Sequence, residues 1–389
     1  MIFKKNRLKS LFKEFIAFFC LLSFLFSPSV YAICYPYPTI EATNFVKDCK
    51  PYRAIGVNYF DAFSRVLKNP QDKSYIQGFE KLSKAGIPFV RMMAGGFWPK
   101  DWELYLKNKK SYFLLLDQVV KTAEKYNIGI IMSLFWNVST IPDIVGEPVS
   151  AWGNNYSKTI DFMKTYTKEI VSRYKNSPAI WGWEFGNEYS NVIDLPGVHY
   201  PKIAPQFGTP SVRTEKDKLK WYDLITALII FSDTVREIDK LRIISTGNSV
   251  PRPSSYHLAF YQTWGKDTKN QFTYMLNLLN PELYNTISVH LYPPRIDSEY
   301  FSEIKIESFK ALINSILNGI PKNRRVLYVG EFGVCSGDKH IKDKNDEINK
   351  FKEFLNAIQS SSVSLAILWV YNMKNEKEGC NVTFDNDRS

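Results

Sequence analysis

Two glutamates of this sequence stand where acid chemistry could be done. Glu188 and Glu331 each end an apolar run that is typical of a buried strand, at residues 180–188 and 326–331. Burying an unpaired carboxylate is costly, so each of these side chains needs a partner or a function. Two carboxyl groups that face each other can cleave a glycosidic bond. One protonates the leaving oxygen, and the other, ionised and about 5 Å away, attacks the sugar.

The elements that would position these glutamates alternate along the chain. Short apolar runs are separated by stretches with helical periodicity, which is the pattern of βα units. Because the runs are continuously apolar, they fit parallel strands that are covered on both faces. The eight predicted strands are Ala54–Tyr59, Ile87–Met92, Gly129–Leu134, Ile180–Asn187, Arg242–Gly247, Thr286–Tyr292, Val326–Glu331 and Leu365–Tyr371.

Helical periodicity is clearest in three of the intervening stretches, where apolar residues recur at spacings of three and four. These residues are Leu224, Leu228, Phe231, Val235 and Ile238, then Phe309, Leu312, Ile313 and Ile316, and finally Ile348, Phe351, Leu355 and Ile358. Gly319 would be the C-cap of the second helix. Eight strands interleaved with helices predict a closed (β/α)₈ TIM barrel. An open doubly wound sheet is the alternative, but no G-x-G-x-x-G follows a strand to support its dinucleotide-binding version.

In such a barrel the chemistry belongs to the carboxyl ends of the strands, where loops shape a pocket over a rigid core. Glu188 and Glu331 fall at the ends of the fourth and seventh predicted strands. Two long turn-rich stretches, Pro196–Pro210 and Pro251–Lys269, follow the fourth and fifth strands and would form part of the rim of that pocket.

Three short motifs, each at the appropriate strand, connect this chain to a known family. They are Asn187-Glu188 after the fourth strand, His290-Leu291-Tyr292 on the sixth, and Gly330-Glu331-Phe332-Gly333 on the seventh. Together and in this order they resemble glycoside hydrolase family 5, the cellulase and β-mannanase family of retaining barrel enzymes. The resemblance runs from Arg91 to Trp369, nearly the whole chain after a predicted export signal.

The resemblance implies a role for each residue of the motifs. Glu188 would be the acid/base and Glu331 the nucleophile. Asn187 would hydrogen-bond the 2-hydroxyl of the sugar, a contact that strengthens in the transition state. Arg91 would keep Glu331 ionised by charge pairing, and Tyr292 would donate a hydrogen bond to it.

Two more residues complete the implied site. His290 would orient the acid/base side, and Trp369 would form an apolar platform under the sugar at the point of cleavage. Each of these side chains also has a structural alternative. The charged ones could form buried ion pairs, His290 could be a satisfied core histidine, and the aromatic ones could pack the barrel.

One position departs from the family pattern. After the third strand the family usually has His-Asn, whereas this chain has Trp136-Asn137. Asn137 keeps the polar half, but Trp136 puts an indole in place of a hydrogen-bonding imidazole. This change weakens the assignment to a cellulase and, with the first strand's Gly56-Val57-Asn58-Tyr59, favours mannan. Both Trp136 and Asn137 are predicted to contact the substrate.

Tryptophans in the predicted strand-to-helix loops could extend the sugar-binding surface, because sugar rings present apolar C–H faces to indole rings. The alternative is that they pack the loops together, since tryptophan is buried on average. These tryptophans are Trp98, Trp102, Trp136, Trp152 and Trp264.

The first 32 residues have the features of an export signal: a basic start, an apolar core over Phe15–Phe26 and a small-residue cleavage site at Val30-Tyr31-Ala32. Residues 33–389 would be a single catalytic domain with a short N-terminal extension. The formal net charge falls from +11 to +7 when the signal's net +4 is removed (11 − 4). The sequence has no cluster of arginines of the kind that binds nucleic acid. An uncleaved anchor is the alternative, although the apolar core is shorter than the roughly 20 residues of a span.

Four cysteines remain after the signal, an even number that suits an oxidising compartment. We predict the pairs Cys34–Cys49 and Cys335–Cys380, with four free buried thiols as the alternative. No cysteine or histidine pair has the spacing of metal ligands, so neither a metal nor a cofactor is predicted.

The sequence as a whole predicts a secreted, monomeric, retaining β-glycoside hydrolase that acts on a β-1,4-linked polysaccharide or oligosaccharide, mannan or glucan. Two other functions fit the same residues. A cell-wall glucan transglycosylase would use a sugar as the acceptor in place of water. A non-catalytic carbohydrate-binding protein would need the scaffold but not the pair of carboxylates.

Overall fold

The computed structural model of this protein describes residues 33–41, 43–197, 199–293, 301–302, 308–321, 325–338, 341–373, 376–377 and 379–386. Tyr35–Ser389 form one compact unit. Residues 1–32, where the export signal is predicted, lie outside the described residues. Within the described ranges, every helix is too short or too polar to cross a bilayer.

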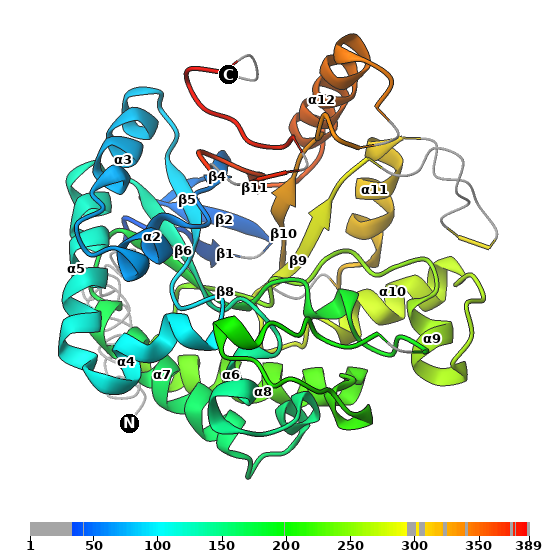
Figure 1. The fold of residues 1–389 in the computed structure, drawn as a ribbon. Helices are drawn as coiled ribbons and strands as arrows, with labels where there is room; N and C mark the ends of the chain where they lie inside the picture. The colour runs from blue at the N-terminus through cyan, green and yellow to red at the C-terminus, as the bar shows by residue number, and fades with distance from the viewer. Residues whose placement is uncertain are drawn as a thin grey trace, which may run out of the picture. The chain divides into compact units, whose positions relative to one another are not determined.

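Eight parallel strands form the predicted barrel, with the helices outside it (Figure 1). In hydrogen-bonded order they run β8-β7-β6-β5-β4-β11-β10-β9. The strands are β4 (Ala54–Asn58), β5 (Phe89–Met93), β6 (Gly129–Phe135), β7 (Ile180–Gly186), β8 (Ile243–Ser245), β9 (Thr286–Leu291), β10 (Val326–Phe332) and β11 (Leu365–Leu368). All eight predicted strands are confirmed, and the closed barrel is the correct alternative.

The strands are followed by helices that cover the outer face of the barrel. The α-helices are α2 (Ala62–Lys68), α3 (Ser74–Lys84), α4 (Glu103–Lys107), α5 (Lys109–Lys125), α6 (Thr140–Val145), α7 (Lys158–Tyr174), α8 (Trp221–Ile238), α9 (Ser255–Tyr261), α10 (Lys269–Leu278), α11 (Phe309–Gly319) and α12 (Lys344–Gln359). Short 3₁₀ turns lie at η1 (Pro99–Trp102), η2 (Val149–Gly153), η3 (Tyr189–Asn191), η4 (Pro205–Phe207) and η5 (Glu215–Asp217).

The three helices predicted from periodicity are α8, α11 and α12. Their apolar stripes face the barrel, so that Leu228 on α8 and Ile313 on α11 are fully buried. Two details of the prediction are wrong. Gly319 is the last residue of α11, and Ile320 is the C-cap, in an extended conformation. On α12 the buried face is turned toward Phe354 and Ile358, so Ile348 remains 41% exposed.

The barrel closes between β8 and β9 through side chains, because these two strands stand at opposite ends of the hydrogen-bonded order. The Asn285 amide accepts from the backbone N–H of Ile244 at 2.8 Å and donates to the carbonyl of Arg242 at 3.2 Å. The Thr286 hydroxyl donates to the carbonyl of Ile244 at 2.8 Å. Two polar side chains therefore replace part of the missing backbone ladder at this seam.

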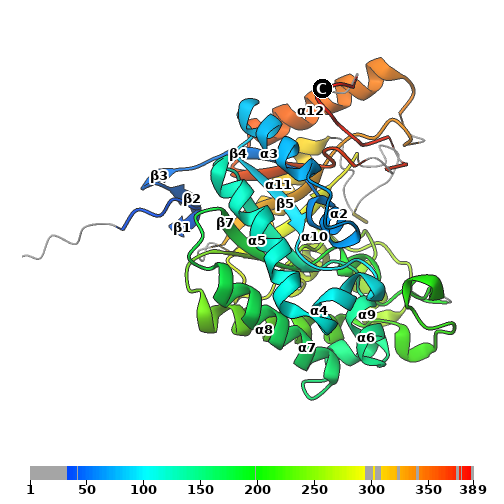
Figure 2. The same ribbon diagram turned by 60° about the vertical axis from the view of Figure 1, so that its left-hand side comes forward.

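The N-terminal extension forms a small antiparallel sheet of β1 (Thr39–Glu41), β2 (Asn44–Lys47) and β3 (Lys50–Pro51), which Figure 2 shows beside the barrel. Phe45 of β2 is fully buried in a cluster with Trp181, Ile243 and Val326. These three residues lie at or near the first positions of their strands, so the extension covers the amino end of the barrel, opposite the carboxyl ends where chemistry is expected.

Disulfide bonds are present where the sequence predicts them. Cys335 and Cys380 are paired, with their Cα atoms 4.3 Å apart. Cys34 and Cys49, the other predicted pair, are disulfide-bonded as well. The Cys335–Cys380 bond joins the segment after β10 to the segment after β11, and both of its cysteines are buried. It therefore ties together two loops that follow the strand carrying Glu331 and the strand preceding Trp369.

Candidate active site

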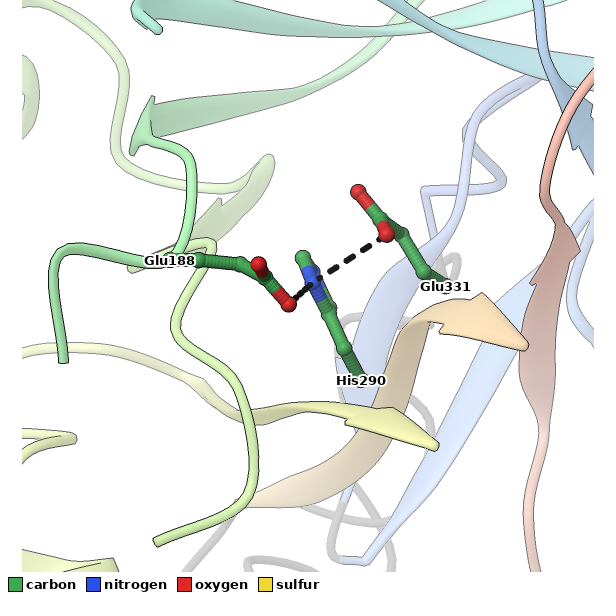
Figure 3. A group of neighbouring side chains, drawn as sticks. All are labelled: Glu188, His290 and Glu331. Carbon is green, nitrogen blue, oxygen red and sulfur yellow. Dashed lines mark hydrogen bonds and ion pairs between the residues drawn. The ribbon is translucent and has the colours of Figure 1, made fainter. Parts of the chain in front are cut away.

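Glu188 and Glu331 meet across the carboxyl end of the barrel, with His290 between them (Figure 3). Glu188 lies two residues after the end of β7, Glu331 lies in β10 and His290 in β9. One carboxylate oxygen of each glutamate and one nitrogen of His290 all lie within 4.8 Å of one another. His290 Nδ1 is 3.0 Å from Glu188 Oε1 and 3.6 Å from Glu331 Oε2. Two segments far apart in the sequence thus bring their carboxyl groups into one site.

The backbone at Glu188 is held in an unusual conformation. Its φ of 53° and ψ of 31° lie in the left-handed region, which is costly for a residue with a side chain. The Glu188 N–H donates to the carbonyl of Gly247 at 2.8 Å, and this bond anchors the turn. Gly247 has a φ of 67°, and a Cβ there would lie 1.9 Å from the carbonyl oxygen of Gly186. The close approach of these two loops therefore requires glycine at position 247.

Arg91, on β5, is hydrogen-bonded to several side chains of the site at once. It is fully buried and donates to Glu331 Oε1 at 2.8 Å, to Glu184 Oε1 at 2.7 Å and to Asn187 Oδ1 at 2.8 Å. A fourth bond, of 3.1 Å, goes to Asn58 Oδ1. Each nitrogen of this buried guanidinium has an acceptor. Moving one of the acceptors away would leave a buried N–H group without its partner, so Arg91 fixes the groups around it.

Glu331 receives a second strong donor from the opposite side. The Tyr292 hydroxyl donates to Glu331 Oε2 at 2.6 Å, a length typical of a bond to an ionised acceptor. Each oxygen of Glu331 thus has its own donor, Arg91 or Tyr292. The side chain is only 5% exposed, so the two donors act with little competition from water.

Three residues of this network were not singled out as site residues from the sequence. Glu184 is fully buried and accepts from Arg91 and from the Ser245 hydroxyl, the latter at 3.0 Å. Asn58 donates to the carbonyl of Gly330 at 3.1 Å, next to Glu331. Glu184 carried the same signal as Glu188, a carboxylate inside an apolar strand, four residues earlier. Asn58 and Ser245 are ordinary polar residues whose importance depends on which strands are neighbours.

Burial and neighbouring charges act on the pKa of both carboxyl groups. Burial raises the pKa of Glu331 above its usual value, against the lowering effect of His290, Arg91 and Tyr292. Burial also raises the pKa of Glu188, but the hydrogen bond and charge of His290 outweigh it and bring that pKa below the usual value. Because the two groups repel each other when both are ionised, they take up protons as a coupled pair.

Arg91 and Tyr292, the two donors to Glu331, each keep one protonation state. Glu184 and Glu331 raise the pKa of Arg91 above its usual value although burial opposes them. Burial and the charge of Glu331 raise the pKa of Tyr292 well above its usual value. Arg91 is therefore always a cation here, and Tyr292 is always a donor.

The predicted aromatic contacts lie on the side of the site that faces β6 and β11. Trp136 follows β6 and stacks over the Arg91 guanidinium, whose Cζ is 4.4 Å from the ring centroid. Trp369 follows β11 and stacks with Trp136, with centroids 6.2 Å apart and ring planes 25° apart. The indole that departs from the family pattern thus covers the buried cation, and such a cation–π contact is strengthened by desolvation.

A hollow of about 440 Å³ opens over the site, and its lining includes Trp136, Asn137, Asn187 and Glu188. Asn187 accepts from Arg91 through Oδ1, which leaves its amide N–H groups for a ligand. Asn137 Oδ1 accepts from the backbone N–H of Ser139 at 3.2 Å and so also shapes its own turn. A second hollow, of about 460 Å³, shares Phe97 and Trp98 with the first.

Residues 48–375, most of the chain, match the family described as Cellulase (glycosyl hydrolase family 5). The chain belongs to this family. The resemblance that was based on three short motifs is therefore confirmed. In this family 5 protein, the match extends from the small N-terminal sheet to the segment after β11.

Curated relatives of this family 5 protein include several mannosidases. A mannan endo-1,4-beta-mannosidase A of Hypocrea jecorina is 34% identical over 172 residues, which is 39% of this chain and 38% of the relative. A mannan endo-1,4-beta-mannosidase 5 of Arabidopsis thaliana is 22% identical over 326 residues, which is 77% of this chain and 69% of the relative. The chain spans less than half the length of the first three relatives it matches.

Solved structures share the fold of this family 5 protein. The endo-1,4-beta-mannanase of Rhizomucor miehei superimposes with a TM-score of 0.63 at 16% identity, covering 90% of this chain and 95% of that one. The beta-1,4-D-mannanase of Cryptopygus antarcticus gives a TM-score of 0.54 at 16% identity, covering 90% and 91%. At this identity the likeness establishes the (β/α)₈ barrel.

The loop tryptophans divide into two groups. Trp102 and Trp152 are fully buried and donate their indole N–H to the carbonyls of Gly96 and Val138. The expectation that they line a sugar cleft is therefore wrong. The alternative, that they pack the loops together, is correct for these two residues. Trp98 and Trp136 line the hollow described above, whereas Trp264 is 57% exposed elsewhere.

One group of described side chains, Glu188, His290 and Glu331, is close enough together to be considered as metal ligands. The guanidinium of Arg91 already lies 2.8 Å from Glu331, and a fixed positive charge at that distance opposes a second cation. Tyr292 donates to the other oxygen of Glu331. The arrangement of this family 5 site therefore favours acid–base chemistry over cation binding.

Proposed function

We propose that this family 5 protein is a secreted, retaining β-glycoside hydrolase that cleaves β-1,4-linked mannan or glucan by double displacement. The observation that carries the proposal is that one carboxylate oxygen of Glu188 lies within 4.8 Å of one carboxylate oxygen of Glu331. Retaining enzymes hold their two carboxyl groups about 5–5.5 Å apart, whereas inverting enzymes need about 6.5–9.5 Å to admit a water. The observed separation supports direct attack by a carboxylate on the sugar.

In the proposed first step, a carboxylate oxygen of Glu331 attacks the anomeric carbon. The bond from that carbon to the leaving oxygen breaks, and Glu188 gives its proton to that oxygen. Arg91 and Tyr292 hold the attacking group in place. Asn187 donates to the 2-hydroxyl of the sugar, and Trp369 supports the apolar face of the ring.

In the proposed second step, water replaces the departed sugar. Glu188 takes a proton from the water, whose oxygen bonds to the anomeric carbon while the ester bond to Glu331 breaks. In the free protein His290 lowers the pKa of Glu188 and burial raises that of Glu331, the reverse of the protonation that the first step needs. The proposed mechanism therefore requires the charge on Glu331 to keep the shared proton on Glu188 once substrate has displaced water, and then to release it. While Glu331 is ionised it raises the proton affinity of Glu188, and ester formation removes that charge.

His290 is proposed to orient Glu188 by a hydrogen bond, while its Nδ1 stays 3.6 Å from Glu331 Oε2. Its Nδ1 lies 3.0 Å from Glu188 Oε1, and the residue is 1% exposed. A buried imidazole in this position selects one rotamer of Glu188. It also links the proton states of the two carboxyl groups, because each senses the charge on the ring.

Mannan is the favoured substrate. The relatives named above as mannan endo-1,4-beta-mannosidases support this choice. So does Trp136, which covers Arg91 where the wider family pattern has a histidine. The two adjoining hollows that share Phe97 and Trp98 fit a chain that occupies several subsites, as endo attack on a polysaccharide requires.

The proposed location is outside the cytoplasm. Residues 1–32 have the pattern of an export signal, and four cysteines are disulfide-bonded, as is typical of an oxidising compartment. Residues 33–389 are proposed to act as one catalytic domain and as a monomer, without nucleic acid, metal or cofactor.

A panel of polysaccharides tests the proposal. Mannan, cellulose, xyloglucan and β-1,3-glucan are incubated with the protein, and new reducing ends are measured. We expect release from mannan first, with the β configuration of the new end retained in the earliest product detected by NMR. An inverted product would refute the assignment of Glu331 as nucleophile, and products longer than the substrate at high concentration would favour the transglycosylase.

Two variants test the roles of the carboxyl groups. Glu331→Ala is expected to abolish turnover without loss of folding. Glu188→Ala is expected to keep slow activity on substrates with good leaving groups, and azide should restore its second step because it needs no general base. Glu353→Ala, which removes an exposed glutamate of α12, is the matched control and should behave as the parent protein. Near-normal hydrolysis by Glu331→Ala would refute the mechanism.

A further inference from the structure

A group of exposed aromatic side chains lies on α9, α10, the loop between them and the start of α8, outside the hollows described above. We call this group the α9 aromatic surface. Its members are Tyr222 (54% exposed), Phe260 (38%), Tyr261 (60%), Trp264 (57%) and Tyr274 (49%). Large aromatic side chains are usually buried, so five exposed ones gathered on three helices and the loop between α9 and α10 indicate a binding surface.

The rings form a connected group. Tyr256, half buried, lies 4.7 Å from Phe260, 5.6 Å from Tyr274 and 6.1 Å from Tyr261, measured between ring centroids. Phe260 in turn lies 5.6 Å from Trp221, the neighbour of Tyr222. Contacts between these rings fix their spacing, and Trp264 is tied to the same segment by the bond of its carbonyl to the Ser254 hydroxyl.

The surface is rigid, because one buried carboxylate holds α9 in place. Asp267, 1% exposed, accepts from the backbone N–H of Tyr256 at 2.8 Å and from that of His257 at 3.1 Å. It also pairs with His257 Nδ1 at 2.7 Å. The Ser254 hydroxyl donates to the carbonyl of Trp264 at 3.1 Å. A surface that is already ordered loses little conformational entropy when it binds a ligand.

The segment that carries α9 is joined to the segment that carries Glu188. The carbonyl of Gly247 accepts from the Glu188 N–H, and Asn248 Oδ1 accepts from the Ser190 N–H at 3.2 Å. Arg252 donates to the carbonyl of Asn191. Both segments follow adjacent barrel strands, β7 and β8, at their carboxyl ends. The α9 aromatic surface therefore belongs to the rim on which the substrate would lie.

We propose that the α9 aromatic surface is a second carbohydrate-binding site, which holds a β-linked polysaccharide chain beside the catalytic groove. This inference rests on the proposed function and extends it. Pyranose rings offer apolar C–H faces to aromatic rings and hydroxyl groups to the tyrosine hydroxyls and the exposed Thr263. On α9 the aliphatic Leu258 points inward and is 1% exposed, so the outward side of this helix offers aromatic rings instead.

Binding can be measured without turnover. The double substitution Tyr261→Ala/Trp264→Ala is made in the inactive Glu331→Ala background, and migration is followed in native gels that contain soluble galactomannan, glucomannan or hydroxyethylcellulose. Glu331→Ala alone is expected to be slowed by at least one polysaccharide. Loss of the two rings should weaken that apparent affinity by about two- to tenfold for each ring. Tyr156→Ala, which removes a 93% exposed tyrosine outside the group, is the matched control and should leave retardation unchanged.

Kinetics of the active protein separate this surface from the groove. In the otherwise unchanged protein, Tyr261→Ala/Trp264→Ala should raise KM for the polysaccharide and leave kcat/KM for a tetrasaccharide and the melting temperature unchanged. An equal loss on both substrates would overturn the proposal, as would unchanged retardation or the absence of retardation by every polysaccharide. Concentration-dependent dimerisation that the double substitution abolishes would assign the surface to protein contact instead. A protein that binds polysaccharide through these rings but hydrolyses none would refute the proposed function alone.

Discussion

Removal of the Tyr292 hydroxyl tests how Glu331, the proposed nucleophile, is kept ionised. Tyr292 donates to Glu331 Oε2 at 2.6 Å, and this bond favours the ionised form of Glu331. In the proposed mechanism Glu331 must be ionised to attack, so kcat/KM is expected to fall as the pH drops through its pKa in the free protein. Tyr292→Phe removes a bond that favours the charged form, which raises the pKa of Glu331. The acid limb of the profile should therefore move to higher pH.

The size of the movement follows from the strength of the bond. A hydrogen bond to a charged group contributes about 1.5–3 kcal/mol when buried. One pKa unit corresponds to about 1.4 kcal/mol, so loss of the bond should move the acid limb upward by about one to two pH units. Arg91 remains at 2.8 Å and continues to pair with the carboxylate, which keeps the shift from growing larger.

The assay is kcat/KM for a short oligosaccharide measured between acid and neutral pH, in buffers of constant ionic strength. Tyr328→Phe is the matched control. Tyr328 is a fully buried tyrosine of the same strand as Glu331, and its hydroxyl has no hydrogen-bond partner among the described residues. It should keep the parent profile. An acid limb that stays in place in Tyr292→Phe, or that moves equally in both variants, would refute the reasoning.

Three further changes have expected results. Glu184→Gln removes one of the two carboxylates on buried Arg91 and should lower the free energy of unfolding by about 1–3 kcal/mol in urea titrations; an unchanged value would mean that Arg91 does not depend on Glu184. Gly247→Ala forces a Cβ against a backbone carbonyl and should destabilise by at least about 2 kcal/mol, seen as a lower melting temperature. Cys335→Ser/Cys380→Ser opens a loop with a sequence separation of 45 and should lower stability by about 3–4 kcal/mol, and the parent protein under reductant should lose at least as much, because Cys34 and Cys49 are then reduced as well.

The fold was predictable because its signals are local. Each barrel strand is a short apolar run between turn residues, and all eight could be located from that pattern alone. Three of the helices, α8, α11 and α12, followed from a period of three to four. What the pattern could not show is how the ring of strands is completed. The bonds of Asn285 and Thr286 across the seam depend on two strands being neighbours, which no single stretch of sequence reveals.

The site was predictable where a residue is unusual for its surroundings. A carboxylate at the end of an apolar strand is rare, so Glu188 and Glu331 were conspicuous. Glu184 is equally unusual, but it lies in mid-strand and was overlooked. The fate of the tryptophans could not be predicted, because exposure depends on which loops meet. Trp152 and Trp264 both lie in loops, yet the first is buried and the second is 57% exposed.

The seam between β8 and β9 has a consequence for the acid pair. Glu188 follows β7 and Glu331 lies in β10, so one route around the ring from the first carboxyl to the second passes over this seam. Backbone hydrogen bonds join the other neighbouring strands of the barrel, whereas the starts of β8 and β9 are joined by the side chains of Asn285 and Thr286. Any loosening of these side-chain bonds would let the gap between the carboxyl groups widen. Under the proposed mechanism, the spacing that favours retention would thus depend in part on Asn285 and Thr286, an asparagine just before β9 and a threonine at its start.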